Sequence, residues 1–429
     1  MDLYFTYPIK VTLAIEQQSS VNFPSVTICN MNRIRKAYEE CLTPGVESFK
    51  CSLGEYGSKD GTLRLPERRI FLSCNSQISG NEHKRADYIT EFFEKYSQIR
   101  IGKLKSYGHQ LQYFIQGCSF KGKRYNEWQF KKFFNSRYGN CFTFNPYPKI
   151  RSKEFNVKTT GRNGGLELVL DIEPQQYLPI THTVGVKVVI HDSGEDPNPE
   201  ETGIAVMPGY ETDIMLHQTV IRRLPKPFKD GCIFYEDCND TSRISQTVCM
   251  QVCLQEYNIA KCGCIEPEFR DIMQANPRLC DIRNSSDICC LDSVLNHLAT
   301  HGTNCNCPLP CVTTAFTEHS TMATWPSSAS FFEGKSNVSN EDWISLKDYR
   351  ASHAKVNIYF STFEKTVYEQ KPSFHESEVY SHLGGEFGLW LGLSIVALFE
   401  FVEFLLIFVN CVAIICKTIF KHFTNKNSP

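Results

Sequence analysis

The chain has 429 residues, long enough for several packing units, and a formal net charge of −2. This charge balance, with no long basic arm, gives no support for a nucleic-acid-binding protein. The 20 cysteines are more informative, because 18 of them precede the long apolar segment near the C-terminus. So many cysteines are unusual in a reducing compartment. We therefore expect an extracellular, disulfide-rich region.

The N-terminal part contains two segments in which apolar residues alternate with polar ones. Val11, Leu13 and Ile15 mark the first segment, and the second covers residues 21–28. A period of two is typical of β-strands. We expect strands in both places.

The region from Arg33 to about Gly139 is polar and mixed. Helical patterns cover residues 86–101 and 125–134, and we expect helices there. The basic cluster at residues 121–124 fits either a processing site or a solvated surface, and the surface is the simpler interpretation.

Residues 164–190 contain two strand patterns, LELVLDIE and GVKVVIHD, separated by Pro174 and Pro179. An acidic turn follows at residues 192–201, and another strand pattern ends near Ile221. The acidic side chains could bind calcium or protons, but a solvated loop is the simpler interpretation.

Residues 232–311 hold twelve cysteines. Short spacings, such as those from Cys249 to Cys253 and from Cys305 to Cys307, are compatible with zinc thiolates. The extracellular context favours disulfides instead, so we expect no metal site. Three N-glycosylation sequons, at Asn239, Asn284 and Asn337, also fit an extracellular location.

Toward the C-terminus, residues 325–349 have the pattern of a loop followed by a helix, and residues 355–370 that of strands. The segment 372–380 then leads into the apolar stretch Leu383–Ile415. No other stretch is long and apolar enough to cross a bilayer. Three lysines follow it, at positions 417, 421 and 426, which favours a cytoplasmic C-terminus.

The apolar stretch is unusual for a plain membrane anchor. As one continuous helix it would reach roughly 50 Å, beyond a hydrocarbon core of about 30 Å. Gly392-Leu393-Ser394 offers a place for the helix to unwind, and irregular backbone at this depth is tolerated only if it is buried or lines a water-filled cavity. Glu400 and Glu403 lie one turn apart, and acids within a membrane segment indicate transport.

Small residues mark one face of the same stretch. They recur at steps of 4, 3 and 4, at Ser381, Gly385, Gly388 and Gly392. Another helix can approach such a face closely, and with the acids this pattern indicates a pore. The alternatives are a single-pass anchor that dimerises through its glycines, or a disulfide-rich receptor or adhesion ectodomain. No enzyme is expected, since no nucleophile elbow, zinc-protease helix or phosphate loop occurs.

The same residues match a known pattern of a Gly-Gly, a Gly, a Gly/Ser-x-Ser and a downstream Glu. They are Gly384-Gly385, Gly388, Gly392-Leu393-Ser394 and Glu400. The stretch thereby resembles the second transmembrane segment of the degenerin/epithelial sodium channel family, which includes acid-sensing and peptide-gated channels. Residues 23–30 (FPSVTICN) and 138–145 (YGNCFTFN) resemble the same family, so the resemblance covers nearly the whole chain.

The resemblance implies an α+β membrane protein with a large disulfide-rich extracellular domain, residues 11–380, on a trimeric helical pore. The implied parts are a wrist (1–10), finger (33–139), palm and β-ball (140–231), thumb (232–311), knuckle (312–354), second palm segment (355–380), pore helix (381–416) and cytoplasmic tail (417–429). Family members carry a first transmembrane helix before the wrist. We therefore expect the chain to start near the outer end of that helix, in a multi-pass plasma-membrane protein.

The resemblance also implies roles for residues of the pore helix. Gly392, Leu393 and Ser394 would form the selectivity filter for permeant Na⁺, with no cofactor. Glu400 and Glu403 would form acidic rings below it. Ser381 matches a position where a bulky side chain is expected to hold the pore open.

The wrist and thumb receive implied roles too. Tyr7 would meet Phe228 or a residue beside it, although an interfacial aromatic residue is an equally simple interpretation. The implied disulfides are Cys29–Cys141, Cys232–Cys311, Cys249–Cys307, Cys253–Cys305 and Cys264–Cys280, with Cys262 joined to Cys289 or Cys290. The pairing of Cys41, Cys51, Cys74, Cys118 and Cys238 stays open.

The gating stimulus is predicted from departures within the family. Acid-gated members carry a His pair after the wrist tyrosine, where this chain has Pro8 and Ile9. No convincing Arg-x-x-Arg processing site occurs in the finger. The resemblance therefore favours the branch gated by FMRFamide-like peptides, with amiloride as blocker and a homotrimer or heterotrimer as the assembly. Mechanical, acid-driven or constitutive opening are the alternatives.

Overall fold

The computed structural model describes residues 6–42, 80–126, 129–145, 155–193, 195–235, 245–269, 273, 277–281, 284–374, 376–392 and 394–425. The chain divides into two compact units. The larger unit contains residues 12–226 and 230–369. The smaller contains residues 1–11, 227–229 and 370–429.

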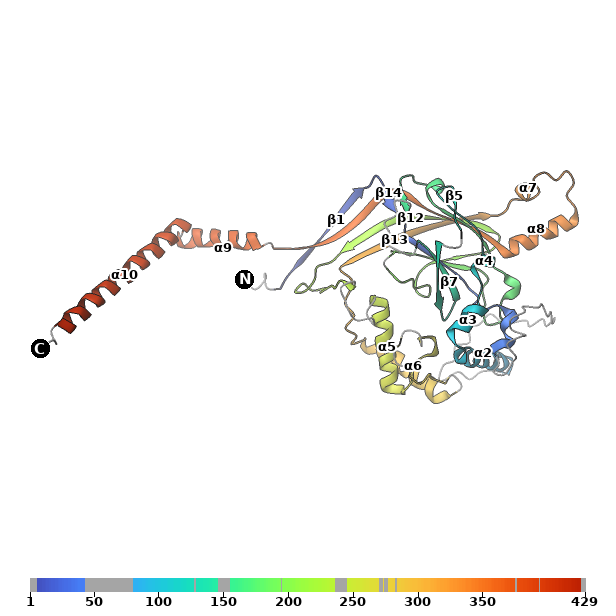
Figure 1. Cartoon of the computed structure of the whole chain (residues 1–429), viewed down its shortest axis with the longest axis horizontal. Helices are drawn as coiled ribbons and strands as arrows, with labels where there is room; N and C mark the ends of the chain where they lie inside the picture. Colours follow the sequence, from blue (N-terminus) through green and yellow to red (C-terminus); the bar gives the residue numbers. More distant parts are fainter. Residues whose placement is uncertain are drawn as a thin grey trace. The chain divides into compact units, whose positions relative to one another are not determined.

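A seven-stranded sheet forms the largest element of the larger unit (Figure 1). Its strands lie in the order β13 (Val312–Thr324), β12 (Tyr210–Arg222), β14 (His353–Pro372), β9 (Leu166–Asp171), β4 (Ile115–Phe120) and β5 (Lys123–Arg124), and β1 (Ile9–Gln17) pairs with β14. The pair β12–β14 is parallel, whereas β12–β13, β14–β9, β9–β4 and β4–β5 are antiparallel.

A second sheet has five strands, in the order β11 (Ile204–Val206), β10 (Val186–His191), β3 (Ser25–Asn30), β7 (Gly139–Phe144) and β6 (Phe130–Asn135). Every residue of β3 and β7 is buried. A small two-stranded sheet pairs β2 (Val21–Asn22) with β8 (Asn156–Val157). The strand patterns predicted at residues 21–28 therefore belong to two strands, separated at Phe23-Pro24.

One hydrophobic core contains side chains from both large sheets. Leu168 of β9, Ile214 of β12 and Phe360 of β14 join Ile28 of β3 and Phe142 of β7 in it, each at most 1% exposed. Along β9 every second residue is buried, as the alternating sequence predicts. The period-two pattern therefore specifies which face of the strand packs inward.

The pairing of β12 with β14 shifts register in the middle. Leu216 lies opposite Phe360, but Gln218 lies opposite Lys365, so residues 361–364 of β14 bulge. Before the shift Ile358 and Phe360 are buried, and after it Val367 is buried.

The described residues between β3 and β4, 31–42 and 80–114, contain helices, as expected for residues 86–101. These are η1 (Lys36–Tyr38), η2 (Glu40–Leu42), α2 (Gly80–Gln98), α3 (Ile101–Tyr107) and α4 (Leu111–Phe114). The helix predicted at residues 125–134 is wrong, because Phe130–Asn135 forms β6. The phenylalanine-rich segment pairs with β7, and Phe130 packs on Phe144 with ring centroids 5.6 Å apart. Tertiary pairing thus overrides the local pattern.

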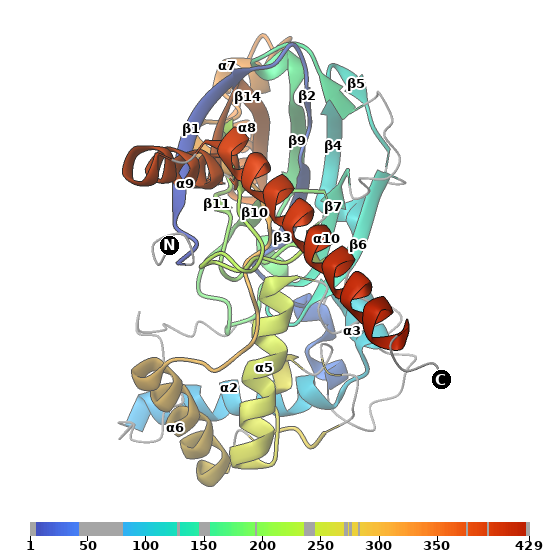
Figure 2. The same cartoon turned by 90° about the vertical axis from the view of Figure 1, so that its left-hand side faces the viewer.

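The other helices of the described residues lie between strands or, at the C-terminus, after the last strand. They are η5 (Arg162–Gly164), η6 (Pro174–Gln176), α5 (Gln246–Cys262), η8 (Pro267–Phe269), α6 (Ser285–His301), α7 (Ser328–Phe331) and α8 (Asn340–Ser352) in the larger unit, and α9 (Glu376–Leu391) and α10 (Ile395–Asn425) in the smaller. Helices α5 and α6 lie side by side (Figures 1 and 2). The loop followed by a helix that was expected at residues 325–349 is present.

Candidate functional site

The long apolar stretch is divided into two helices. Helix α9 ends at Leu391, and Gly392 has a φ of 64°, in the left-handed region that favours glycine. The N–H of Gly392 donates to the carbonyl of Gly388 at 3.1 Å. The stretch therefore breaks at the predicted position instead of continuing as one helix.

Ser394 starts the second helix. Its Oγ accepts a hydrogen bond from the N–H of Ala397 at 3.1 Å, and its carbonyl accepts from the N–H of Leu398 at 3.1 Å. This is the geometry of an N-cap, which satisfies one of the free N–H groups of α10. Leu393, the middle residue of the predicted filter, lies outside the described residues.

Helix α10 exposes its apolar side chains. Residues 396–417 have the length and mean hydropathy, 2.4, of a membrane-spanning helix, and none of that window is buried. In the part of the chain that the structure describes, it is the one helix with these properties. Glu400 and Glu403 lie within it and are exposed. An apolar surface of this kind requires lipid or protein around it.

The small residues of α9 are also exposed. A Cβ atom placed on Gly384 or Gly385 would meet no atom within 4 Å, and Ser381 and Gly388 are exposed as well. Within the described ranges, no contact of the chain with itself explains these glycines. Close approach of another helix would explain them.

The predicted aromatic contact at the wrist is present in the smaller unit. The rings of Tyr7 and Phe228 meet edge to face, with centroids 5.8 Å apart. One residue on, the carbonyl of Pro8 accepts a hydrogen bond from the N–H of Ser373 at 2.9 Å. The segment just before α9 is therefore held by the N-terminal segment.

Six disulfides link described cysteines. They are Cys29–Cys141, Cys232–Cys311, Cys249–Cys307, Cys253–Cys305, Cys262–Cys290 and Cys264–Cys280. These are the implied pairs, and Cys262 takes Cys290 of the doublet. Cys41 and Cys289 are also disulfide-bonded, and Cys118 is a free thiol whose burial raises its pKa to about 12. Cys51, Cys74 and Cys238 lie outside the described residues.

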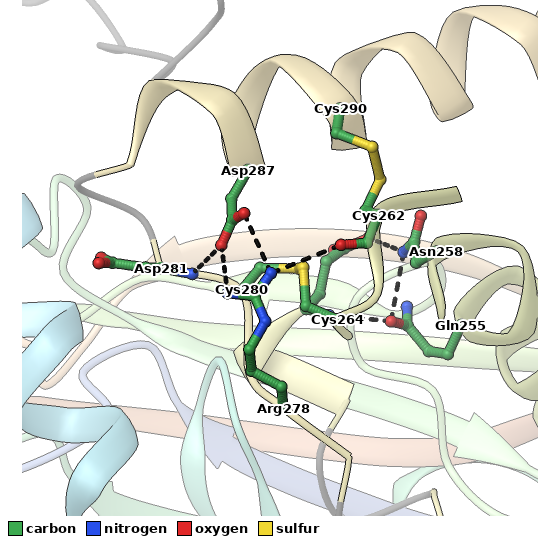
Figure 3. The surroundings of a disulfide bond; sticks show 10 residues. Gln255, Asn258, Cys262, Cys264, Arg278, Cys280, Asp281, Asp287 and Cys290 are labelled. Carbon is green, nitrogen blue, oxygen red and sulfur yellow. Dashed lines mark hydrogen bonds and ion pairs between the residues drawn. A yellow bond between two sulfur atoms is a disulfide. The ribbon is translucent and has the colours of Figure 1, made fainter. Parts of the chain in front are cut away.

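Polar contacts support the two disulfides at the C-terminal end of α5 (Figure 3). The carboxylate of Asp287, in the first turn of α6, accepts hydrogen bonds from the Arg278 guanidinium at 2.8 and 3.1 Å and from the N–H of Asp281 at 2.8 Å. The hydrogen bond from Arg278 holds the pKa of Asp287 below its usual range. The amide oxygen of Gln255 accepts from the N–H of Glu266 at 3.0 Å. The chain near these disulfides is thus fixed by ionic and amide contacts as well.

A buried ionic cluster near the helices was not predicted. Nδ1 of His109 lies 2.8 Å from Oε2 of Glu173, and the Arg35 guanidinium lies 3.0 Å from Oε1 of the same carboxylate. Burial alone would raise the pKa of Glu173, but the hydrogen bond and charge of His109, together with Arg35, outweigh it, so the pKa is lowered. These residues lie far apart in sequence, and no local motif marks them.

Of the predicted glycosylation sites, Asn284 and Asn337 are exposed, and Asn239 lies outside the described residues. The side-chain oxygen of Asn284 accepts from the N–H of Ser286 at 3.0 Å and caps α6. Among the described side chains, no group of three His, Cys, Asp or Glu is suited to a metal ion.

Comparisons with known proteins all point to one family of sodium channels. A family model described as "Amiloride-sensitive sodium channel" matches residues 1–404. Acid-sensing ion channel 2 of Danio rerio is 27% identical over 94% of this chain and 73% of its own length. Degenerin del-1 of Caenorhabditis elegans is 27% identical over 84% of this chain and 54% of its own length. The FMRFamide-activated amiloride-sensitive sodium channel of Cornu aspersum is 23% identical over 93% and 74%.

Proposed function

Because this chain belongs to the amiloride-sensitive sodium channel family, we propose that it is a pore-forming subunit of a sodium-selective cation channel in the plasma membrane. The observation that carries the proposal is the break at Gly392 and Ser394 inside an apolar helical stretch. At a break, backbone carbonyls can turn toward a permeant cation. The Ser394 hydroxyl accepts one hydrogen bond from Ala397, which leaves a second lone pair for the cation.

The acids of α10 support cation selectivity. Glu400 and Glu403 are one turn apart and exposed in the single chain. An acid facing lipid is costly, whereas an acid facing a water-filled pore attracts cations and repels anions. We propose that each forms a ring in the assembled channel.

The proposed assembly is a trimer of identical or related subunits, each with a first transmembrane helix, around a central pore. The exposed glycines at positions 384, 385 and 388 of α9 support contact between subunits, since they allow helices to approach closely. In this proposal residues 11–380 are extracellular and form the finger, palm, β-ball, thumb and knuckle of the family. Residues after 416 are cytoplasmic.

Gating would reach α9 along the chain. Strand β14 runs to Pro372 and α9 begins at Glu376, so a movement of the strand pulls on the start of the helix. The hydrogen bond between Pro8 and Ser373 supports this route, because it couples the N-terminal segment to the chain just before α9. The contact between Tyr7 and Phe228 ties the same N-terminal segment to the loop at residues 227–229.

For the stimulus, we propose an extracellular peptide resembling FMRFamide. Pro8 and Ile9 stand where a His pair is expected in acid-gated members, and an FMRFamide-activated channel is among the relatives. Acid-sensing channels and degenerins are relatives as well, so protons and mechanical force are the competing stimuli.

Whole-cell recording from oocytes that express the full-length protein tests the proposal. FMRFamide and pH steps are applied in turn, amiloride is then added, and Ser394→Ala is recorded alongside. We expect a peptide-evoked sodium current that amiloride blocks, with altered selectivity in the variant. Current evoked only by acid would replace the peptide with protons. Silence to every stimulus, even with Ser381→Trp, would contradict channel formation by this subunit alone.

A further inference from the structure

We propose that a pocket between α5 and α6 binds a short cationic peptide through the peptide's apolar side chains. The pocket has a volume of about 550 Å³, within the range of roughly 300–1,000 Å³ typical of ligand sites. The inference rests on the proposed peptide gating and assigns that gating to a particular site.

The walls of the pocket are two helix faces. Met250 and Leu254 lie one turn apart on α5, and Leu295 and Leu298 lie one turn apart on α6, with Ala299 beside them. Leu295 is 47% exposed although it is a large apolar residue. Covering this leucine and its neighbours would remove apolar surface from water, which favours binding of an apolar group.

Polar groups sit at the same pocket. Gln246 and Gln251 of α5 line it, and their side-chain amides can bond to the backbone of an extended peptide. Glu201, at the end of the acidic turn 192–201, also lines it, and no arginine or lysine of the described residues does. No ion pair or hydrogen bond involves the Glu201 carboxylate in the described part of the chain. The pocket therefore favours a ligand that is apolar and positively charged.

Disulfides make the pocket preformed. Cys253, on α5, is joined to Cys305, which itself lines the pocket, and the bond Cys249–Cys307 lies one turn away. The segment after α6 is thereby fixed against α5. A rigid site loses less conformational entropy when a ligand binds, so a small peptide can bind with useful affinity.

FMRFamide carries these features, with two phenylalanines, a methionine, an arginine and a free amino terminus, and it is the probe for the test. The half-activating concentration is measured for full-length Leu295→Asp and Glu201→Gln channels. We expect an increase of about tenfold or more for Leu295→Asp and a smaller increase for Glu201→Gln. Matched controls are Ile259→Asp and Glu256→Gln, exposed residues of α5 that do not line the pocket, and neither should change it by more than about twofold.

Surface biotinylation of each variant separates loss of binding from loss of folding. Glu201→Gln is a conservative change of an exposed side chain, so it keeps the test valid if Leu295→Asp fails to reach the surface. An unchanged half-activating concentration in Glu201→Gln and in Leu295→Asp at the surface would overturn the pocket while leaving peptide gating intact.

A binding measurement separates the two proposals. Leu295 is replaced by the photoreactive p-benzoylphenylalanine in the full-length channel, and tritiated FMRFamide, which keeps its free amino terminus, is cross-linked. Labelling that excess unlabelled FMRFamide removes supports the pocket, even if the peptide evokes no current and the gating proposal fails. No labelling at position 295, or labelling no stronger than that from p-benzoylphenylalanine at the control position 259, overturns the pocket.

Discussion

The two-sheet core and the cysteine-rich segment 232–311 differ in what fills their interiors. Aliphatic and phenylalanine side chains from both sheets fill the core, and the disulfide Cys29–Cys141 joins the neighbouring strands β3 and β7 of one of those sheets. Among the described residues of the segment, most buried apolar side chains are half-cystines, and the others are Ile265, Val294 and Leu298. Two short helices bury too little apolar surface to hold each other, so covalent bonds replace that contribution.

The comparison shows that the two regions are stabilised in different ways, one by apolar packing and the other by disulfides. The core loses stability when apolar contacts are removed, and it is insensitive to the redox state except at one bond. We expect the segment to lose its arrangement under reduction, because its described residues have few buried apolar contacts. Substitutions can test this difference, and their expected effects decrease from Phe360→Ala to Ser245→Ala.

Phe360→Ala should have the largest effect, because Phe360 is 1% exposed and lies in the core between the sheets. Truncating a buried phenylalanine leaves a cavity and costs about 3–5 kcal/mol. Thermal unfolding of the full-length protein in detergent measures the loss, with Met322→Ala, which is 53% exposed, as control. A loss equal to that of the control would contradict the assignment of the core.

Removal of the two neighbouring bonds Cys249–Cys307 and Cys253–Cys305, by serine at all four positions, comes next. We expect a loss of about 3–4 kcal/mol in the free energy of unfolding. Cys232–Cys311 still closes the segment, so the loops that open are the shorter ones between that bond and the two removed bonds. Removal of Cys253–Cys305 alone should cost less than half as much, since the neighbouring bond still closes nearly the same loop. Limited proteolysis within 245–311 reports the change. Equal losses for one bond and for two would contradict this account.

Glu173→Gln tests the buried ionic cluster near the helices. The lowered pKa of Glu173 means that the folded state favours the carboxylate, so its contribution is present above the ordinary carboxyl pKa and lost as pH falls through the folded value. We expect a loss of roughly 1–3 kcal/mol at neutral pH that disappears in acid. Unfolding measured from pH 7 to pH 3 checks this. Parallel pH curves for the wild type and the variant would rule out the linkage.

Ser245→Ala should have the smallest effect, in the segment held by disulfides. The Ser245 hydroxyl caps α5 by accepting from the N–H of Val248 at 3.2 Å, and loss of such a cap costs about 1 kcal/mol. Ser245→Asp keeps an acceptor and is the control. Because two disulfides anchor the next turns of α5, proteolysis there should hardly change in either variant. Ready cleavage within α5 in Ser245→Ala, but not in Ser245→Asp, would show that the disulfides alone do not protect α5 from proteolysis.

Local patterns predicted most of the strands and the helix break. The alternation in β9 and the Gly392-Leu393-Ser394 motif carry their signals within a few residues, and the structure agrees with both where it describes them. The disulfide pairs followed from the family resemblance, because spacing alone leaves many pairings possible.

Features made by distant residues escaped prediction. Residues 125–134 have a helical pattern, but the pairing of Phe130–Asn135 with β7 makes that segment the strand β6. Glu173 meets Arg35 and His109 only after folding, and the pocket at Leu295 combines two helices with an acidic turn. None of these contacts has a period or motif that a single sequence shows.

The register shift in β14 changes which of its side chains face inward, from even-numbered residues before the shift to the odd-numbered Val367 after it. Between Phe360 and Lys365 it advances five residues while β12 advances two, so it carries three extra residues. An odd excess reverses which side chains face inward, and Val367 is buried where the earlier alternation would have buried its neighbours. Val220 of β12 lies opposite Val367 and is also buried, and paired residues share a face of the sheet, so this pairing keeps Val367 inward. In related proteins, then, the number of bulged residues should vary more freely than the number of paired residues on either side.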